Sequence, residues 1–278
     1  MFSRQAIYEW LRVNPLITGA ERVHQYKLLS TQQTWFPDIF YFHNGIDLVM
    51  KCSKGVYNAE ASALRFLNEC GLQLPVPVLV DEIFVEEEGN SYTVMTRMPG
   101  ERLSSQSELL KDLDAIRPVV EDIFCVLRKL WTLRQPTALA GKVMVSASGH
   151  GLPDPTDSFS SLAGPFNTIL DCYHHIAHSN SRDELYREAV QAVTADTVVY
   201  VHCDLRSHNI LVKDGRLSGI VDWENSGWLP LHWQLQVVRY RCRSTQGLLH
   251  YVLNERQKGI DESEAAYAAS FELLYWPL

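Results

Sequence analysis

The sequence predicts an α+β protein with two lobes, a β-rich N-terminal lobe that contains one main helix and a mostly helical C-terminal lobe. The first third of the chain contains strand-like runs separated by hairpin dipeptides, and apolar residues at helical spacing follow. A chain of 278 residues is also too long for one small core. We expect residues 1–98 to form the first lobe and residues 99–278 the second.

Three strands, a helix and two further strands are expected in the N-terminal lobe. The dipeptides Asn44-Gly45 and Gly89-Asn90 supply the positive φ angles that two-residue hairpin turns require. The helix is expected at Ala59–Cys70, with Asn58 as its N-cap and Gly71 as its stop. The strands that flank the two turns are Ile39–Phe42, Ile46–Lys51, Ile83–Val85 and Tyr92–Met95.

The C-terminal lobe is expected to begin with a long helix at about Glu108–Leu133. Its apolar residues recur at helical spacing: Ile116, Val119, Val120, Ile123, Leu127 and Leu130. The segment Gln135–Pro165 is rich in Pro, Gly and Ser, which favours a long irregular connection. Helices are expected near Phe166–Ala177 and Arg182–Thr194, and most of the chain after residue 233 is expected to be helical.

Composition excludes several classes of function. The net charge of −8 argues against a nucleic-acid partner, because such surfaces are usually basic. No apolar run reaches the length of a membrane span, and the N-terminal segment lacks a secretory signal. The six cysteines are scattered without a CxxC pair, so we expect free thiols and a cytoplasmic protein. The sequence carries no signal for an oligomeric state.

The segment Val201–Glu224 concentrates the polar residues that phosphoryl transfer needs. Asp204 can orient a substrate hydroxyl and accept its proton. Asn209 and Asp222 offer the hard oxygen ligands that Mg²⁺ prefers. A hairpin turn at Asp214-Gly215 would return the chain so that Asp222 lies near Asn209. For each residue alone, a turn or a cap would be the ordinary interpretation.

This segment resembles the aminoglycoside phosphotransferase and choline kinase-like family. The resemblance rests on His202-x-Asp204-x4-Asn209 and on the IVDWE run at Ile220–Glu224. The stretch Ser226–Trp233 also resembles a branch of that family. It implies a protein-kinase-like bilobal fold, ATP and Mg²⁺ as cofactors, and a hydroxyl on a small molecule as acceptor. It also implies that Asp204 is the catalytic base and that His202 shapes the loop by hydrogen bonding.

The resemblance extends to the nucleotide side of the site, which we expect in the cleft between the lobes. It implies that Lys51 holds the α- and β-phosphates, that Glu60 pairs with Lys51, and that backbone groups near Arg97 and Met98 bind adenine. Lys54 is a nearby competitor for Lys51. As alternatives, Lys51 could be a solvated lysine, and Glu60 could be an acidic residue that is favoured by the helix dipole alone. Arg97 and Met98 could belong to a plain linker.

The acceptor side is less defined by the sequence. Glu224 could bind a cationic or hydroxyl group of the acceptor, or make a structural hydrogen bond. Trp223 and Trp228 could wall the acceptor pocket, although packing in the core is the commoner role of such residues. The residue pattern identifies neither the acceptor nor the choice of ATP over GTP.

One departure from the family leaves other functions open. The region Leu29–Pro37, where a kinase nucleotide loop usually has glycines, contains none. A catalytically silent nucleotide-binding or scaffold protein of the same fold is therefore one alternative, and a non-kinase biosynthetic reaction on this scaffold is another. Retention of all four polar positions, Lys51, Asp204, Asn209 and Asp222, favours a phosphotransferase.

Overall fold

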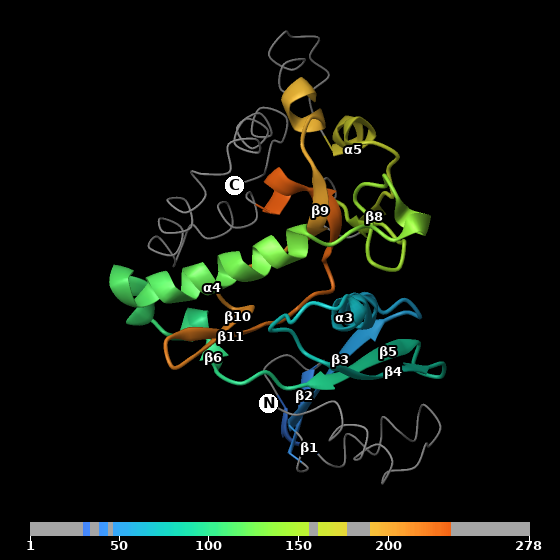
Figure 1. Cartoon of the computed structure of the whole chain (residues 1–278). Coiled ribbons are helices and arrows are strands. Elements are labelled where there is room, and N and C mark those ends of the chain that lie inside the picture. The colour runs from blue at the N-terminus through green and yellow to red at the C-terminus, as the bar shows by residue number, and fades with distance from the viewer. Residues whose placement is uncertain (1–29, 34–38, 44–46, 156–160, 177–189, 235–278) are drawn as a thin grey trace. The chain divides into compact units, whose positions relative to one another are not determined.

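The computed structural model describes residues 30–33, 39–43, 47–155, 161–176 and 190–234. The chain divides into two compact units (Figure 1). The first consists of Met1–Gly71 and Val76–Met98, and the second of Leu72–Pro75 and Pro99–Leu278. The short segment 72–75 joins the second unit because the Ile220 amide donates to the Pro75 carbonyl oxygen over 2.8 Å. The described part contains both strands and helices, which confirms the predicted α+β class.

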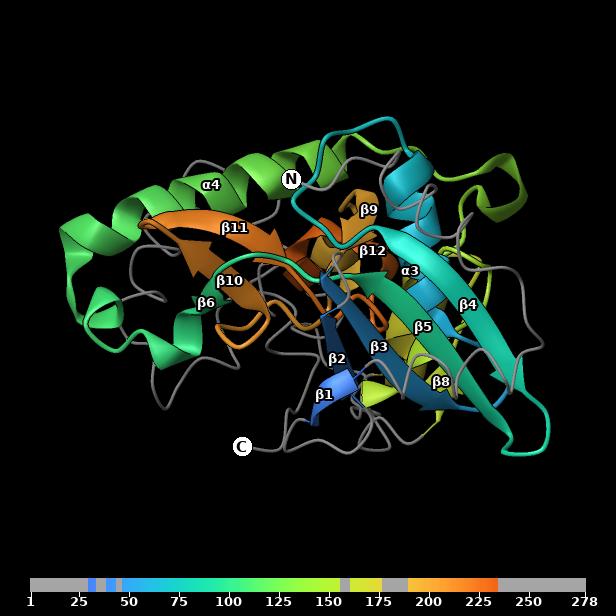
Figure 2. The ribbon, with the colours of Figure 1, turned by 90° about the horizontal axis from the view of Figure 1, so that it is seen from below.

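The first unit is built on a five-stranded antiparallel sheet in the order β1-β2-β3-β5-β4 (Figure 2). One helix, α3 (Ala59–Glu69), lies against it. The predicted chain order of three strands, a helix and two strands is confirmed. The strands are β1 (Ser30–Gln33), β2 (Ile39–His43), β3 (Asp47–Lys54), β4 (Leu79–Val85) and β5 (Asn90–Thr96).

Alternation along the strands builds the core of this sheet. Leu48 and Met50 of β3 are 2% and 0% exposed, as expected for residues two apart on the same face. They form one buried cluster with apolar residues of β4 and β5: Ile83, Val85, Tyr92 and Val94. Burial of this apolar surface is the main stabilising contribution to the unit.

The start of α3 is tied to the sheet by its cap. The side-chain oxygen of Asn58 accepts from the Ala61 amide over 3.0 Å and from the Thr93 hydroxyl over 2.8 Å. The first bond satisfies an amide that the helix leaves without a partner, and the second joins the helix to β5. Gly71, with φ of +79°, follows the end of the helix. Both sequence signals for this helix are confirmed.

The second unit contains the long predicted helix, α4 (Leu113–Trp131), preceded by a 3₁₀ turn η2 (Leu109–Lys111). The helix begins later than the sequence pattern indicated, because the Asp112 side chain caps it by accepting from the Asp114 and Ala115 amides. The apolar stripe is confirmed, since every one of its members is 0% exposed: Ile116, Val119, Val120, Ile123, Leu127 and Leu130.

Short sheets and a second helix complete this unit. Strands β6 (Glu101–Arg102), β10 (Ile210–Lys213) and β11 (Arg216–Ile220) form one sheet, in the order β11-β10-β6, and α4 packs against β11 (Figure 2). Strand β9 (Val198–Val201) pairs with β12 (Gly227–Pro230), and β7 (Leu152–Pro153) pairs with β8 (Leu162–Ala163). The remaining elements are α5 (Ile169–Ile176) and the turns η1 (Leu103–Ser105) and η3 (Thr137–Leu139).

The irregular connection predicted at Gln135–Pro165 is held by close backbone contacts. A Cβ atom on Gly151 would lie 2.3 Å from the Ala163 carbonyl oxygen, and one on Gly227 would lie 2.5 Å from that of Val145. Only glycine permits such an approach, so this segment lies directly against the start of β12. The connection therefore has a defined path although it contains little regular structure.

Several expectations lie outside the described residues. They are the Asn44-Gly45 turn, the centre of the glycine-free region at 34–37, most of the Arg182–Thr194 helix and the chain after residue 234. The helix expected at Phe166–Ala177 begins later, at Ile169. None of the helices in the described ranges is long and apolar enough to cross a membrane. The five cysteines within those ranges are free thiols, as predicted.

We predict that Asn58→Ala lowers the free energy of unfolding of the first unit by about 1–2 kcal/mol, because it removes a helix cap and a buried bond to β5. The shift of the urea midpoint measures it. Arg65→Ala on the same helix is the control, because its ion pair with Glu82 is exposed and worth at most about 1 kcal/mol. Equal shifts for the two variants would contradict the capping role.

Candidate active site

The loop between β9 and β10 carries the predicted motif, and His202 organises it. The imidazole is 1% exposed. Its Nδ1 accepts from the Asp204 amide over 3.1 Å, and its Nε2 faces the Val221 carbonyl oxygen at 3.1 Å. Because Nδ1 accepts, the proton lies on Nε2 and is donated to Val221. His202 thus joins the loop to the segment that leads into Asp222.

The charge state of His202 follows from its burial. Enclosure in the protein lowers the pKa of His202 below its ordinary value, because burial disfavours the charged ring more strongly than the bond to Val221 and the nearby carboxylates favour it. The Trp223 ring packs edge-on against the imidazole with centroids 4.5 Å apart. A neutral imidazole with both nitrogens engaged is suited to holding backbone, not to transferring protons.

Asp204 is held at both carboxylate oxygens. The Asn209 amide nitrogen donates to the Asp204 carbonyl oxygen over 2.8 Å and to carboxylate oxygen Oδ2 over 3.1 Å. The Nε atom of Arg206 lies 2.6 Å from Oδ1. The Asp204 side chain is 16% exposed, so the carboxylate is oriented but still reaches the surface of its unit.

Two basic residues of this loop were not foreseen from the sequence. Arg206 pairs with Asp204, and the Nε2 atom of His208 lies 3.8 Å from its Oδ2. The signal available in the sequence was a basic side chain at the second and at the fourth position after Asp204. It was uninformative alone, because basic residues in loops are usually solvated. Arg206 therefore places positive charge beside the Asp204 carboxylate.

The hairpin between β10 and β11 brings Asp222 back to the loop. Asp214 and Gly215 have φ angles of +53° and +72°, and Lys213 pairs with Arg216 across the two-residue turn. The Val221 amide then donates to the Asn209 carbonyl oxygen over 3.0 Å. Asp222 follows directly in a left-handed conformation, with φ of +69°. The predicted return of the chain toward Asn209 is therefore present.

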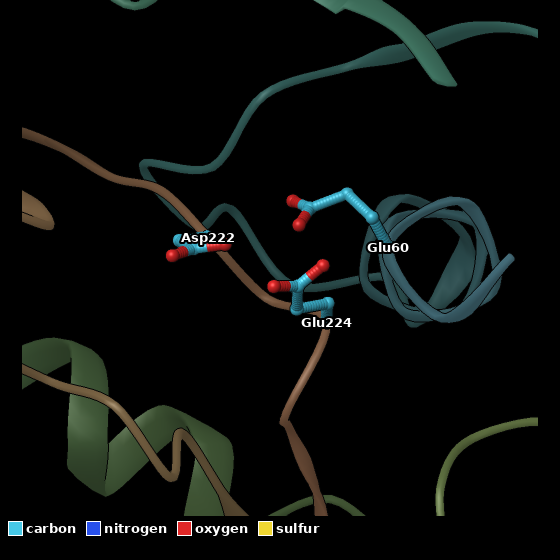
Figure 3. Close-up of side chains that lie close together, drawn as sticks. All are labelled: Glu60, Asp222 and Glu224. Carbon is cyan, nitrogen blue, oxygen red and sulfur yellow. The ribbon is translucent and has the colours of Figure 1, made fainter. Parts of the chain in front are cut away.

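Asp222 and Glu224 present their carboxylates together. A carboxylate oxygen of each lies within 4.8 Å of the other, and both residues are partly buried on one short segment (Figure 3). Trp223 between them is buried, as expected when alternate side chains of an extended segment point apart. Two carboxylates at this separation repel each other unless a cation or a proton is present. This donor set fits Mg²⁺, which prefers oxygen ligands.

Asn209 is oriented consistently with such a role. Its amide nitrogen is engaged by Asp204, so the oxygen is the side-chain atom left for a cation. The residue is 4% exposed, and its backbone amide donates to the Arg206 carbonyl oxygen over 2.9 Å. A buried amide held at both its backbone and its nitrogen keeps its oxygen in one direction.

In the first unit, Lys51 and Glu60 form an ion pair. The Lys51 Nζ atom lies 3.1 Å from Glu60 Oε2, and the Glu60 side chain is 0% exposed. Glu60 projects from the first turn of α3 (Figure 3). A buried carboxylate without a partner would destabilise the fold. The ion pair with Lys51, and not the helix dipole alone, therefore accounts for Glu60 at this position. Lys54, the competing lysine, is exposed.

Arg97 and Met98 follow β5 at the end of the first unit. Arg97 is exposed and Met98 is partly buried. The preceding Thr96 amide donates to the Val78 carbonyl oxygen over 3.0 Å, which fixes the end of the strand. The expected role in binding adenine belongs to backbone groups, so it stays a prediction.

Trp223 and Trp228 differ from the expectation that they wall an acceptor pocket. Both are 0% exposed. Trp223 donates its indole N–H to the Ile220 carbonyl oxygen over 2.8 Å, and Trp228 packs edge-on against Tyr200 with ring centroids 5.3 Å apart. Because an enclosed ring offers no surface to a ligand, the structure corrects this assignment in favour of core packing.

Comparison with known proteins identifies the family. The model of a phosphotransferase enzyme family matches residues 48–238, which include Lys51, Glu60 and the whole segment from His202 to Glu224. The chain belongs to this family. No curated protein matches the sequence closely enough to add a finer assignment.

Solved structures of aminoglycoside phosphotransferases share the fold. APH(4)-Ia superposes with a TM-score of 0.62 at 13% identity, over 91% of this chain and 88% of that one. APH(2'')-IIa, in a complex with streptomycin and ATP, gives 0.58 at 15% identity over 94% and 90%. The ADP-bound APH(2'')-Ib gives 0.55 at 15% identity over 94% and 88%. The predicted resemblance and the kinase-like α+β fold are therefore confirmed.

We predict that the second unit loses stability in mild acid through His202. In the unfolded chain, His202 takes up a proton near the ordinary histidine pKa of about 6.5. In the folded protein the pKa of His202 is lower, so the ring stays neutral to a lower pH. Stability therefore falls as the pH drops below about 6.5. Urea midpoints between about pH 7.5 and pH 5 measure this, and His202→Gln should flatten the dependence. An equally steep dependence in that variant would contradict the assignment.

Proposed function

We propose that this protein transfers the γ-phosphoryl group of ATP to a hydroxyl group of a small molecule. The observation that carries the proposal is the arrangement of the loop and hairpin in the second unit. Asp204 is oriented by Asn209, and the segment bonded to Asn209 leads directly into Asp222. Phosphoryl transfer depends mainly on such positioning and on electrostatic stabilisation, because little covalent chemistry is required of the protein.

Asp204 would act on the acceptor. A hydroxyl within hydrogen-bond reach of its carboxylate is oriented toward the phosphoryl group and gives up its proton to that carboxylate as the new bond to phosphorus forms. Asn209 prevents the carboxylate from rotating, and Arg206 supplies positive charge beside it. His202 keeps the backbone of Asp204 in place and takes no proton itself.

Asp222 and Asn209 would hold Mg²⁺, and Lys51 would hold phosphate oxygens of the nucleotide. When bound, the metal ion neutralises negative charge that develops on the phosphate oxygens. Glu60 keeps the Lys51 ammonium in one position. Glu224, whose carboxylate lies near that of Asp222, would add negative charge on the acceptor side or at the metal.

The relatives support this choice of nucleotide and acceptor class. APH(4)-Ia forms a ternary complex with AMP-PNP and hygromycin B, and APH(2'')-IIa forms one with ATP and streptomycin. By analogy, ATP is the proposed donor, and a hydroxyl-bearing small molecule that carries positive charge is the proposed acceptor class. The net charge of −8 and the carboxylate of Glu224 are consistent with a cationic acceptor.

Asp204→Asn tests the base directly. We expect turnover to fall by about 10²–10⁴-fold with little change in the affinity for ATP, because the amide cannot accept the hydroxyl proton. A screen of small-molecule hydroxyl compounds monitored by ADP release provides the measurement. Asp214→Asn is the matched control, since this exposed residue lies in the hairpin turn, where Asn also tolerates positive φ.

The proposal fails if the unaltered protein binds Mg·ATP but phosphorylates no compound and releases no ADP. That outcome would assign the chain to a silent nucleotide-binding role. Full turnover in the Asp204→Asn variant would instead remove Asp204 as the base while leaving the activity in place.

Asp222→Ala tests the metal site. ATP should raise the melting temperature of the unaltered protein only when Mg²⁺ is present, and the variant should lose that rise because binding to the folded state stabilises it. Asp171→Ala, which removes an exposed carboxylate from α5, is the control and should keep it. Retention of the magnesium-dependent rise in the Asp222 variant would place the metal elsewhere.

A further inference from the structure

Gln234 binds the backbone of the catalytic loop at a point that the sequence motif does not include. Its side-chain oxygen accepts from the His202 amide over 2.9 Å, and its side-chain nitrogen donates to the His202 carbonyl oxygen over 3.2 Å. The residue is 0% exposed. One side chain thus satisfies both backbone polar groups of a residue 32 positions earlier in the chain.

These two bonds satisfy backbone groups that face away from β12. Val201, the last residue of β9, pairs with Gly227, and one step earlier Tyr200 pairs with Trp228. The backbone of Trp228 bonds to Met144 and Val145 on its other side, so Tyr200 and Trp228 form a non-hydrogen-bonded pair, and by the antiparallel alternation the polar groups of His202 also point away from β12. The backbone groups of His202 would be buried without partners, which is costly, and the primary amide of Gln234 has the donor and acceptor needed to satisfy them.

The segment that carries Gln234 is held independently of the loop. The Leu231 amide donates to the Thr197 carbonyl oxygen over 2.9 Å. The His232 ring lies between Asp196, at 2.5 Å from its Nδ1, and the hydroxyl of Tyr173 on α5. All of these side chains are almost fully buried. Gln234 therefore extends from a fixed support, as precise placement of a neighbouring residue requires.

We propose that Gln234 is a positioning residue for phosphoryl transfer, acting through His202. The imidazole of His202 holds the Asp204 amide on one side and the Val221 carbonyl oxygen on the other. A shift of the His202 backbone would therefore displace the base and the segment leading into Asp222 together. Gln234 fixes that backbone in both directions without contacting substrate. This inference rests on the function proposed above.

The test uses Gln234→Met in the full-length protein, because methionine fills similar space but makes neither bond. The first readout is ADP release from Mg·ATP with water as the acceptor. We expect kcat to fall about 10- to 100-fold, the range seen when a residue that orients a catalytic group is lost, with KM for ATP within about two-fold. Tyr200→Phe is the matched control, because it removes a buried bond from β9 to Ser226. It should leave kcat within about two-fold.

The second readout is hydrogen exchange of backbone amides at residues 202–209, which does not depend on turnover. We expect faster exchange there in Gln234→Met than in Tyr200→Phe. Gln234→Glu, which keeps the acceptor and loses the donor, replaces the methionine variant if that variant does not fold. If the unaltered protein releases no ADP with water or with any compound of the acceptor screen, the proposed function fails, and exchange alone then decides the positioning inference.

Three results would overturn the inference. The first is unchanged kcat in an active Gln234 variant. The second is an equal fall of kcat in Tyr200→Phe, which would indicate a general loss of stability. The third is unchanged exchange at residues 202–209 in the Gln234 variant.

Discussion

The pair of hydrogen bonds made by the buried ring of His202 is the interaction on which the rest of the site depends. Between β9 and β10 the chain forms neither helix nor strand, so no repeating backbone pattern fixes its path. One neutral imidazole supplies a central part of that restraint, by accepting from Asp204 and donating to Val221. In an interior of low dielectric constant such bonds are strong, and leaving either group unpaired is costly. Asp204 and the segment leading into Asp222 are thus held by the same ring.

Within each unit the carboxylates have defined environments. In the first unit Glu60 is enclosed and pairs with Lys51, and in the second unit Asp204 lies beside the Asn209 amide and the Arg206 guanidinium. Asp222 and Glu224 instead face each other, which favours uptake of a cation. The environment of Asp204 is therefore suited to accept a proton. The environments of Asp222 and Glu224 are suited to hold a metal ion or a cationic group. Such differences in environment commonly mark catalytic sites.

Local features of the chain were predictable from the sequence because neighbours in the chain determine them. Asn58 caps α3, Asp214 and Gly215 form the two-residue turn, and the apolar stripe of α4 is buried. Each depends on residues within a few positions, or on a period that one element repeats. Contacts across the unit were not predictable in this way. The enclosure of Trp223 and Trp228 and the backbone contacts at Gly151 and Gly227 depend on tertiary packing.

The sequence by itself determined which reactive groups this protein carries, their order, and the reversal of the chain that returns Asp222 toward Asn209. Short-range backbone preferences suffice for that, because a turn with positive φ admits few residue types. Only the tertiary structure decided which of these groups touch and what supports them. Gln234 illustrates the reason: its amide meets the backbone of His202 because β12 and the segment after it pack beside β9. Hydrogen bonds between residues so distant in the chain depend on how whole elements pack, which no local pattern encodes.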